Sequence, residues 1–274
     1  QDVQDKAGKV VGNLWNTKTE TASRLRQRIE TVLSWAAFRG LRPQGDNPAR
    51  WKGHLDNELT ARNKVQKQQH HAALPYVEIG AFMAELRGRD APAARALEFS
   101  ILTATRSSET RLALWAEFDM KNRLWIIPAE RMKKDKEHEI PLTDKMVAVL
   151  DALPREEGNP HVFIGTSRHG TMSENALTNV LKRMGREDLT NHGFRSTFRE
   201  WAGEATAHPR EVVEHALAHS LKDRAEAAYQ RGTLLPKRRR LMEDWSNYCG
   251  IVQPKDGDNV VPMRGVVAER RLEA

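Results

Sequence analysis

Residues 192–199, His-Gly-Phe-Arg-Ser-Thr-Phe-Arg, place a histidine and an arginine three positions apart at the start of a predicted helix over 193–204. The H-x-x-R pattern of His192 and Arg195 is too short to indicate a function by itself. Its meaning depends on the chemical groups that stand before and after it in the chain.

Two further groups of polar residues stand on either side of this stretch. Upstream, Arg106-Ser-Ser-Glu109 forms an R-x-x-E pattern between two predicted helices. Downstream, His219 precedes Tyr229 by ten residues on a basic segment, and Tyr229 is one of only three tyrosines in the chain. Arginine, histidine and tyrosine side chains are therefore available in several separate parts of the sequence.

These residue types suit cleavage of a phosphodiester by a tyrosine. Arginine is permanently charged and binds phosphate oxygens through paired hydrogen bonds. Histidine donates hydrogen bonds to the same oxygens or moves a proton. The leaving 5′-oxygen needs an acid, which a lysine can be. A phenol with a pKa of about 10 needs cationic surroundings to become a nucleophile.

The rest of the pattern is mostly helical. Apolar residues at helical spacing predict a long helix with one apolar face, with Thr19 or Thr21 as its N-cap and Gly40 at its end. Residues 124–128 and 138–142 resemble strands and flank a basic connector, which predicts a hairpin or small sheet. Further helices are expected over residues 75–88, 91–104, 107–118, 143–152, 173–184, 208–218, 222–230 and 235–248.

Composition restricts the class of protein. The 274 residues carry 44 Lys and Arg against 37 Asp and Glu, a net charge of +7, with 39% hydrophobic and 30% charged residues. This balance is typical of a globular protein, and no run of about 18 apolar residues predicts a membrane span. The single cysteine, Cys249, excludes an internal disulfide and a cysteine-rich zinc site. The positive charge favours a polyanionic partner, nucleic acid first.

Taken together, these segments resemble the tyrosine recombinases, and in particular the P4-like integrases of phages and genomic islands. The resemblance extends over nearly the whole chain. It depends on the order of the segments and on the spacing of ten residues between His219 and Tyr229. The matching segments are residues 103–109, 127–133, 137–142, 192–199 and 216–219, Tyr229, and the Lys237-Arg-Arg-Arg-Leu-Met helix.

The resemblance implies that one set of residues binds the scissile phosphate. Arg106 and Arg195 would clamp it. His192 and His219 would hydrogen-bond its oxygens, with His192 as the better candidate for accepting a proton. Glu109 would orient the first arginine or support the pocket without reacting.

A second set would carry out the covalent chemistry. Tyr229 would attack the phosphate and form a 3′-phosphotyrosine link, and Lys133, or alternatively Lys134, would protonate the leaving 5′-hydroxyl. Tyr248 is expected to serve in packing. Because the phosphotyrosine conserves bond energy, the resemblance implies no metal, ATP or other cofactor, and the sequence has no G-x-x-x-x-G-K-[ST] phosphate loop.

The fold implied by the resemblance is mainly α-helical with a small β-sheet or hairpin. Residues 1–70 would form part of a SAM-like helical core-binding domain, 71–250 the α+β tyrosine-recombinase catalytic domain, and 251–274 a C-terminal tail. Nothing resembles the family's N-terminal arm-binding domain, so a fragment or an unusually short member is expected. DNA contacts are expected from Arg50, Lys52, Arg62, Lys64, Lys67, Lys134 and Arg199, and Trp51 is a candidate DNA-facing aromatic.

The implied function is site-specific DNA recombination, the integration or excision of a prophage or genomic island. The implied partners are double-stranded attachment sites, a homotetramer formed on DNA, and accessory DNA-bending or excisionase proteins. No membrane partner is expected, and the protein would act at the nucleoid in the bacterial cytoplasm. A type IB topoisomerase, a catalytically silent DNA-binding regulator and a metal-dependent nuclease are the alternatives.

Overall fold

The computed structural model describes residues 2–4, 10–65, 72–165, 167, 170–219 and 232–253. By its internal contacts the chain divides into two compact units, Gln1–His70 and His71–Ala274.

The first unit is built around one long helix. The aromatic pair Trp15 and Trp51 stacks beside it, with ring centroids 5.3 Å apart, and the Trp15 indole donates a hydrogen bond to the Thr60 carbonyl at 2.8 Å. These contacts connect Trp15, near the start of the unit, with residues 51 and 60 near its end. The described elements are β1 (Asp2–Gln4), β2 (Val10–Asn13), α1 (Leu14–Thr17), α2 (Thr19–Phe38), η1 (Leu55–Asn57) and α3 (Arg62–Val65).

The long predicted helix is present as α2, but its N-terminal cap differs from the prediction. The N-cap is Lys18, which makes no side-chain capping bond, and Thr19 is already the first helical residue. At the other end Gly40 has a φ of +70°, and its amide bonds back to the Ala37 carbonyl at 3.1 Å. The predicted role of glycine at this end is confirmed, because a left-handed residue after a helix is most easily a glycine.

The apolar face of α2 is exposed in the described part of the first unit. The loop after the helix contacts a residue outside this face, because Arg26 donates a hydrogen bond to the Ala49 carbonyl at 2.6 Å. The apolar stripe therefore lies uncovered by the described segments of this unit. Its members and their exposed fractions are Leu25 (46%), Ile29 (44%), Val32 (61%), Trp35 (54%) and Phe38 (84%).

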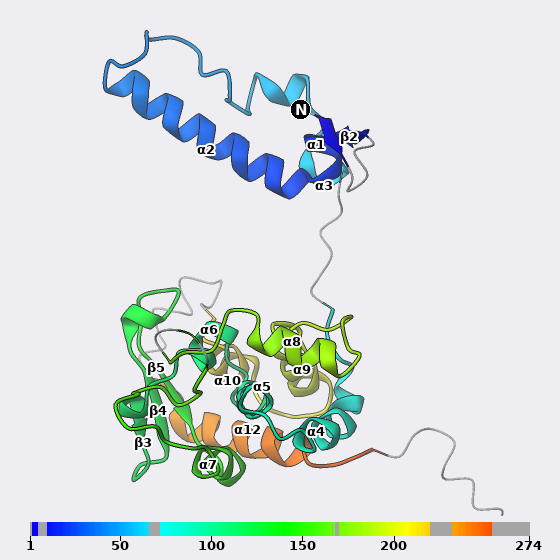
Figure 1. Ribbon diagram of the computed structural model, residues 1–274, viewed down its shortest axis with the longest axis vertical. Coiled ribbons are helices and arrows are strands. Elements are labelled where there is room, and N and C mark those ends of the chain that lie inside the picture. Colours follow the sequence, from blue (N-terminus) through cyan, green and yellow to red (C-terminus); the bar gives the residue numbers. More distant parts are fainter. Residues whose placement is uncertain are drawn as a thin grey trace, which may run out of the picture. The chain divides into compact units, whose positions relative to one another are not determined.

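The second unit is a helical body arranged around α5 (Pro92–Thr103). Nearly every residue of α5 from Ala94 onward is buried, and the helix lies in the middle of the unit with other helices around it (Figure 1). The other α-helices within the described residues of this unit are α4 (Ile79–Arg87), which follows the 3₁₀ turn η2 (Tyr76–Glu78), α6 (Ser107–Arg111), α7 (Asp144–Asp151), α8 (Ala176–Arg183), α9 (Gly193–Glu204), α10 (Arg210–Ala216) and α12 (Leu235–Tyr248). Predicted helices 193–204 and 235–248 match α9 and α12, whereas predicted helix 222–230 lies outside the described residues.

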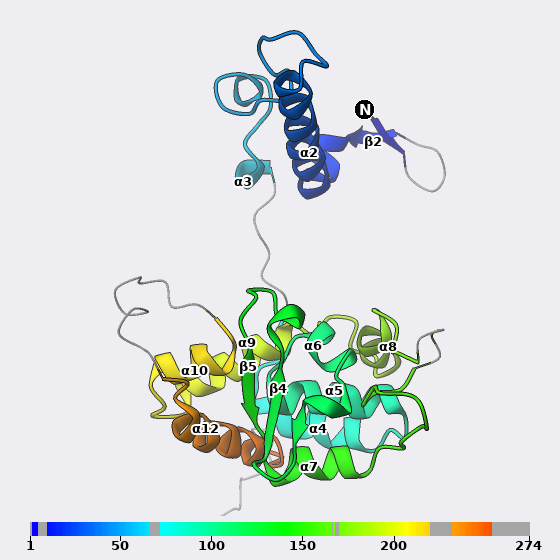
Figure 2. The same cartoon turned by 90° about the vertical axis from the view of Figure 1, so that its left-hand side faces the viewer.

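A three-stranded antiparallel sheet stands at one side of this body (Figure 2). Its strands are β3 (Phe118–Asp119), β4 (Leu124–Ile127) and β5 (His138–Pro141), in that order, with Trp125 opposite Ile140 and Ile127 opposite His138. Trp125 and Ile127 are fully buried, so the face of β4 that carries them packs into the core. The predicted fold class, mainly helical with one small sheet, is confirmed.

The predicted helix 107–118 is wrong in its second half. Helix α6 ends at Arg111, a short 3₁₀ turn η3 covers Trp115–Glu117, and β3 begins at Phe118. The cause is a distant segment: the Trp115 amide bonds to the Pro160 carbonyl at 3.0 Å and the Val162 amide to the Ala113 carbonyl at 2.9 Å. Such pairing across the chain replaces the local helical hydrogen bonds.

Trp245 in α12 fixes this helix to the core. It is fully buried, its indole donates to the Ile101 carbonyl at 2.9 Å, and its ring lies 5.0 Å from Trp201. We expect Trp245→Ala to lower the free energy of unfolding by about 3–5 kcal/mol, because it leaves a cavity the size of an indole. Urea unfolding followed by circular dichroism measures it. Val77→Ala, at a 51% exposed site in the same unit, should change stability by less than about 0.5 kcal/mol.

None of the helices in the described ranges is both long and apolar enough to cross a membrane.

Candidate active site

Arg106 is positioned by the turn between α5 and α6. Ala104 ends α5 with a φ of +51°, and the buried hydroxyls of Thr103, Thr105 and Thr110 form a chain with oxygen separations of 2.8 and 2.7 Å. Glu109 then accepts hydrogen bonds from the Arg106 amide at 2.8 Å and from its Nη1 at 2.6 Å. The Glu109 side chain is 3% exposed, so the guanidinium is held by a carboxylate within the protein.

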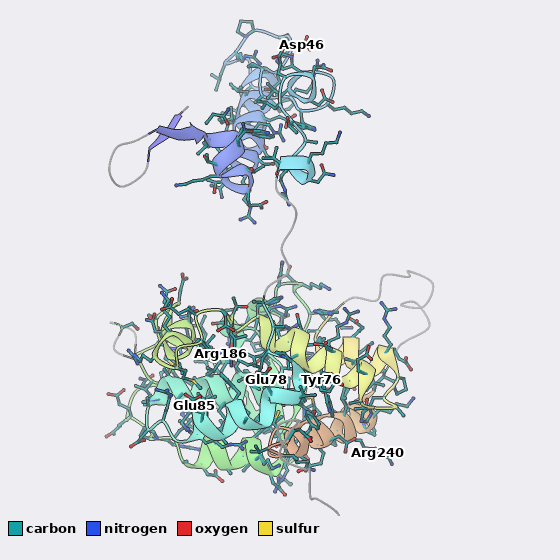
Figure 3. The ribbon with its side chains drawn as sticks, turned by 90° about the vertical axis from the view of Figure 1, so that its right-hand side faces the viewer. Asp46, Tyr76, Glu78, Glu85, Arg186 and Arg240 are labelled. Atoms are coloured by element: carbon teal, nitrogen blue, oxygen red, sulfur yellow. The ribbon has the colours of Figure 1, made fainter. Side chains whose placement is uncertain are left out.

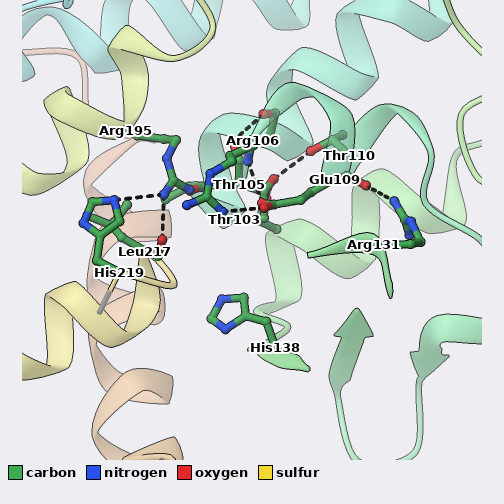
Figure 4. A network of polar contacts seen from close by, with 12 residues as sticks. Thr103, Thr105, Arg106, Glu109, Thr110, Arg131, His138, Arg195, Leu217 and His219 are labelled. Carbon is green, nitrogen blue, oxygen red and sulfur yellow. Dashed lines mark hydrogen bonds and ion pairs between the residues drawn. The ribbon is translucent and has the colours of Figure 1, made fainter. Parts of the chain in front are cut away.

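Arg195 projects from α9 and joins two distant turns. It is 5% exposed, donates from Nη1 to the Ala104 carbonyl and from Nη2 to the Leu217 carbonyl at 2.6 Å, and lies 3.3 Å from His219 Nε2 (Figure 4). Burial and the charge of Arg106 lower the pKa of Arg195 to about 10. The guanidinium therefore remains charged at neutral pH.

His219 follows α10 through a left-handed residue, Ala218, with a φ of +48°. Its Nδ1 lies 2.6 Å from Glu214 Oε2. Burial lowers the pKa of His219, and the charges of Arg195 and Arg106 act in the same direction, while Glu214 opposes them. The neutral imidazole is thereby favoured in the protein without DNA.

Arg106, Arg195 and His219 thus come together from three separate parts of the chain. The charge of Arg106 acts on both other side chains, which places the three in one electrostatic environment. Two guanidinium groups held close together repel each other, and a bound anion would relieve that repulsion. The arrangement suits a phosphate, which accepts the paired hydrogen bonds that guanidinium groups donate.

The basic connector between β4 and β5 is anchored beside this group. Arg131, in the 3₁₀ turn η4 (Ala129–Arg131), pairs with Glu117 and donates from Nη2 to the Glu109 carbonyl at 2.6 Å. Lys133 and Lys134 follow on an exposed turn. The structure places both lysines on the same turn, and the choice between them stays a prediction.

The remaining predicted catalytic residues are less fully described. His192 is exposed at the residue before α9, next to the buried Asn191. Tyr229 lies outside the residues that the structure describes. Tyr248 packs between aromatic rings, 5.6 Å from Trp201 and 6.3 Å from Tyr76 of η2 (Figure 3), and burial raises its pKa. A raised pKa makes Tyr248 a poorer nucleophile.

The predicted DNA-binding residues of the first unit lie in and after the loop that follows α2. Arg50 pairs with Asp46 at 3.0 Å and Arg62 with Glu20 at 2.8 Å, while Lys52 and Lys64 are exposed. Lys67 lies outside the described residues.

Two other predicted DNA contacts have partners within the protein. One side of the Trp51 ring stacks on Trp15, and the Arg26 guanidinium lies 5.7 Å from its centroid, so this aromatic serves packing in the first unit. In the second unit, Arg199 bonds to Glu214 at 2.9 Å.

Three side chains of this region make contacts that the sequence motifs do not predict. Glu214 holds His219, and Arg131 links the sheet to the Arg106 turn. His138 of β5 is buried with its Nε2 3.2 Å from the Ala216 carbonyl, and burial lowers its pKa to about 4. No short sequence motif predicts these contacts, because the partners are distant in sequence or because the residue types are too common to be distinctive. Among the described residues no group of three or more His, Cys, Asp or Glu could hold a metal ion.

Family models match both units of the chain. The model of the phage integrase family matches residues 73–233, and that of the phage integrase central domain matches residues 6–54. The integrase of Enterobacteria phage P4 is 31% identical over 263 residues, covering 87% of this chain and 57% of its own length. The prophage integrase IntZ of Escherichia coli K12 is 30% identical over 249 residues, covering 90% and 60%. The chain therefore spans a little over half the length of these relatives.

Solved structures share the fold at low sequence identity. A lambda integrase fragment (75–356), bound as a dimer to a COC′ core site, has a TM-score of 0.53 at 16% identity over 74% of this chain and 73% of its own. The integrase of mycobacterium phage Brujita has a TM-score of 0.51 at 16% identity, covering 89% and 79%. The resemblance stated from the sequence is confirmed: the chain belongs to the phage integrase family of tyrosine recombinases.

Proposed function

We propose that this chain is a site-specific recombinase that cuts and rejoins DNA through a 3′-phosphotyrosine. The observation that carries the proposal is the convergence of Arg106, Arg195 and His219, each fixed by its own partner. Preorganised cations lower the energy of a phosphoryl-transfer transition state because they meet the developing charge without rearranging. The family membership of the chain supports the same chemistry.

The proposed step is a displacement at phosphorus. The Tyr229 oxygen forms a bond to phosphorus as the bond to the 5′-oxygen breaks, and the tyrosine proton passes to His192. Lys133 gives a proton to the leaving 5′-oxygen. Religation reverses these transfers with a different 5′-hydroxyl. The phosphate ester is conserved throughout, so the step requires neither ATP nor a change of redox state.

The two units have separate proposed roles. Unit 1 is part of the core-binding domain and contacts the duplex through Arg50, Lys52, Arg62, Lys64 and Lys67, and unit 2 is the catalytic domain, with Lys134 and Arg199 as further DNA contacts. A dimer and a tetramer of lambda integrase are each seen on DNA, the tetramer on a Holliday junction. We propose by analogy that four copies assemble on two attachment sites in the bacterial cytoplasm, with accessory DNA-bending or excisionase proteins as further partners.

The lysine assignment has a direct test. We expect Lys133→Ala to slow cleavage by roughly 100-fold or more, because the 5′-oxygen then leaves without its acid. A substrate with sulfur in place of that 5′-oxygen needs no acid and should restore the rate. Lys134→Ala is the matched control on the same turn and should stay within a few fold. If sulfur rescues Lys134→Ala and not Lys133→Ala, the assignment is reversed.

A two-site assay separates recombination from its alternatives. Two DNA molecules that carry the attachment region, one of them labelled, should yield labelled recombinant joints in buffer with EDTA. Relaxation of supercoils without joints would indicate the topoisomerase reading. Binding without cleavage would indicate a silent regulator, and activity that EDTA abolishes would indicate a metal-dependent nuclease.

A further inference from the structure

Glu214 holds His219 on the side opposite Arg195. It lies in α10, its side chain is 11% exposed, and its Oε2 is 2.6 Å from His219 Nδ1. Its Oε1 accepts a hydrogen bond from Arg199 Nε at 2.9 Å, with Arg210 Nε 4.0 Å away. Both carboxylate oxygens are engaged, so the carboxylate is held in one orientation.

The partners of the two ring nitrogens determine where the His219 proton lies. Burial acts to raise the pKa of Glu214, but the hydrogen bond from His219 and the charge of Arg199 lower it overall, so Glu214 is ionised at neutral pH. A carboxylate only accepts, so Nδ1 must carry the hydrogen. Arginine only donates, so Nε2, 3.3 Å from Arg195 Nη2, presents its lone pair.

We propose that Glu214 is a positioning residue for the phosphate site: it fixes His219 with Nδ1–H toward the carboxylate and with Nε2 toward the Arg195 guanidinium. The inference rests on the proposed function for the identity of the bound group. Its geometric part, the fixed tautomer, concerns the protein without DNA.

The carboxylate has a second role once a phosphate enters. For Nε2 to donate a hydrogen bond to a phosphate oxygen while Nδ1–H remains bonded to Glu214, the ring must take up a second proton from solvent. Burial and the charges of Arg195 and Arg106 oppose that protonation, and Glu214 favours it. A phosphodiester adds negative charge on the Nε2 side. Glu214 and the phosphate would therefore stabilise the imidazolium from its two nitrogens.

The first experiment is NMR of the full chain with ¹⁵N-labelled histidine and without DNA. The His219 signals are assigned by their loss in His219→Gln. We expect the wild type above the His219 pKa to show Nδ1 protonated and Nε2 unprotonated. In Glu214→Gln we expect a mixture of tautomers and a lower His219 pKa, because a negative charge is lost. Glu211→Gln removes the same charge from the same helix, away from His219, and should match the wild type.

The second experiment measures covalent attachment to plasmid DNA carrying the attachment region, as a function of pH. Glu214→Gln should slow attachment roughly tenfold or more and move the alkaline decline in rate to lower pH. A wild-type His219 with Nε2 protonated in the free protein would overturn the inference, as would an unchanged tautomer, pKa and rate profile in Glu214→Gln. Loss of all attachment in the wild type, with the NMR result as expected, would instead contradict the proposed function.

Discussion

Replacing Tyr229 with phenylalanine should abolish covalent attachment of the chain to DNA while leaving DNA binding within a few fold. The substitution removes one oxygen, the atom that forms the bond to phosphorus, and keeps the ring. Arg106, Arg195 and His219 are held by partners other than Tyr229, so the phosphate site should remain intact. SDS-resistant protein–DNA complexes on a gel measure attachment, and a mobility shift measures binding.

Tyr248→Phe is the matched control for this prediction. Tyr248 lies among Trp201, Trp245 and Tyr76, and its pKa is raised by burial. Its loss should leave attachment within a few fold. If Tyr229→Phe still forms the complex and Tyr248→Phe does not, the nucleophile has been assigned to the wrong tyrosine.

Arg195→Lys should lower the rate of covalent attachment by roughly 100- to 1000-fold. The guanidinium reaches the Ala104 and Leu217 carbonyls and His219 Nε2 at once. A lysine ammonium is a compact point charge, and it lacks the planar guanidinium fork that donates hydrogen bonds to two oxygens in parallel. The loss should fall on cleavage more than on DNA binding, because Arg195 is buried and contributes little to the exposed charge.

The same substitution should also reduce stability, by about 1–3 kcal/mol, since at least one buried carbonyl loses its donor. Thermal unfolding of the DNA-free protein measures this part separately. Arg240→Lys, at an exposed position of α12 (Figure 3), is the control and should alter neither attachment nor stability appreciably. An active Arg195→Lys variant with wild-type stability would contradict the account of this residue.

Local sequence signals predict the fold where local interactions dominate. Helices α9 and α12 have the bounds that the pattern indicates, and Gly40 closes α2 as a left-handed residue. The prediction fails over 107–118, because the backbone there bonds to residues 160–162 and no pattern within the segment shows those partners. The N-cap of α2 differs from the prediction because α1 ends directly before it, so that Lys18 is both the C-cap of α1 and the N-cap of α2.

In the candidate site, too, contacts between residues close in sequence could be predicted and contacts between distant residues could not. Arg106 and Glu109 bond to each other three positions apart, so a short motif contains both. Arg195 and His219 are 24 positions apart in the sequence. Their contact could be predicted only from the family resemblance, which rests on the order of the matching segments. The bonds of Arg131 to Glu117 and of Arg199 to Glu214 join residues on different elements, and only the folded structure shows them.

In the proposed reaction, Tyr229 becomes covalently linked to DNA without a metal ion. The most direct measurement incubates the protein with attachment-region DNA in EDTA, stops the reaction with SDS, digests both components and identifies the nucleotide-bearing peptide by mass. We expect a nucleotide on Tyr229, in the peptide that follows His219. A nucleotide on Tyr248, or DNA cleavage that leaves no nucleotide on the protein, would contradict it.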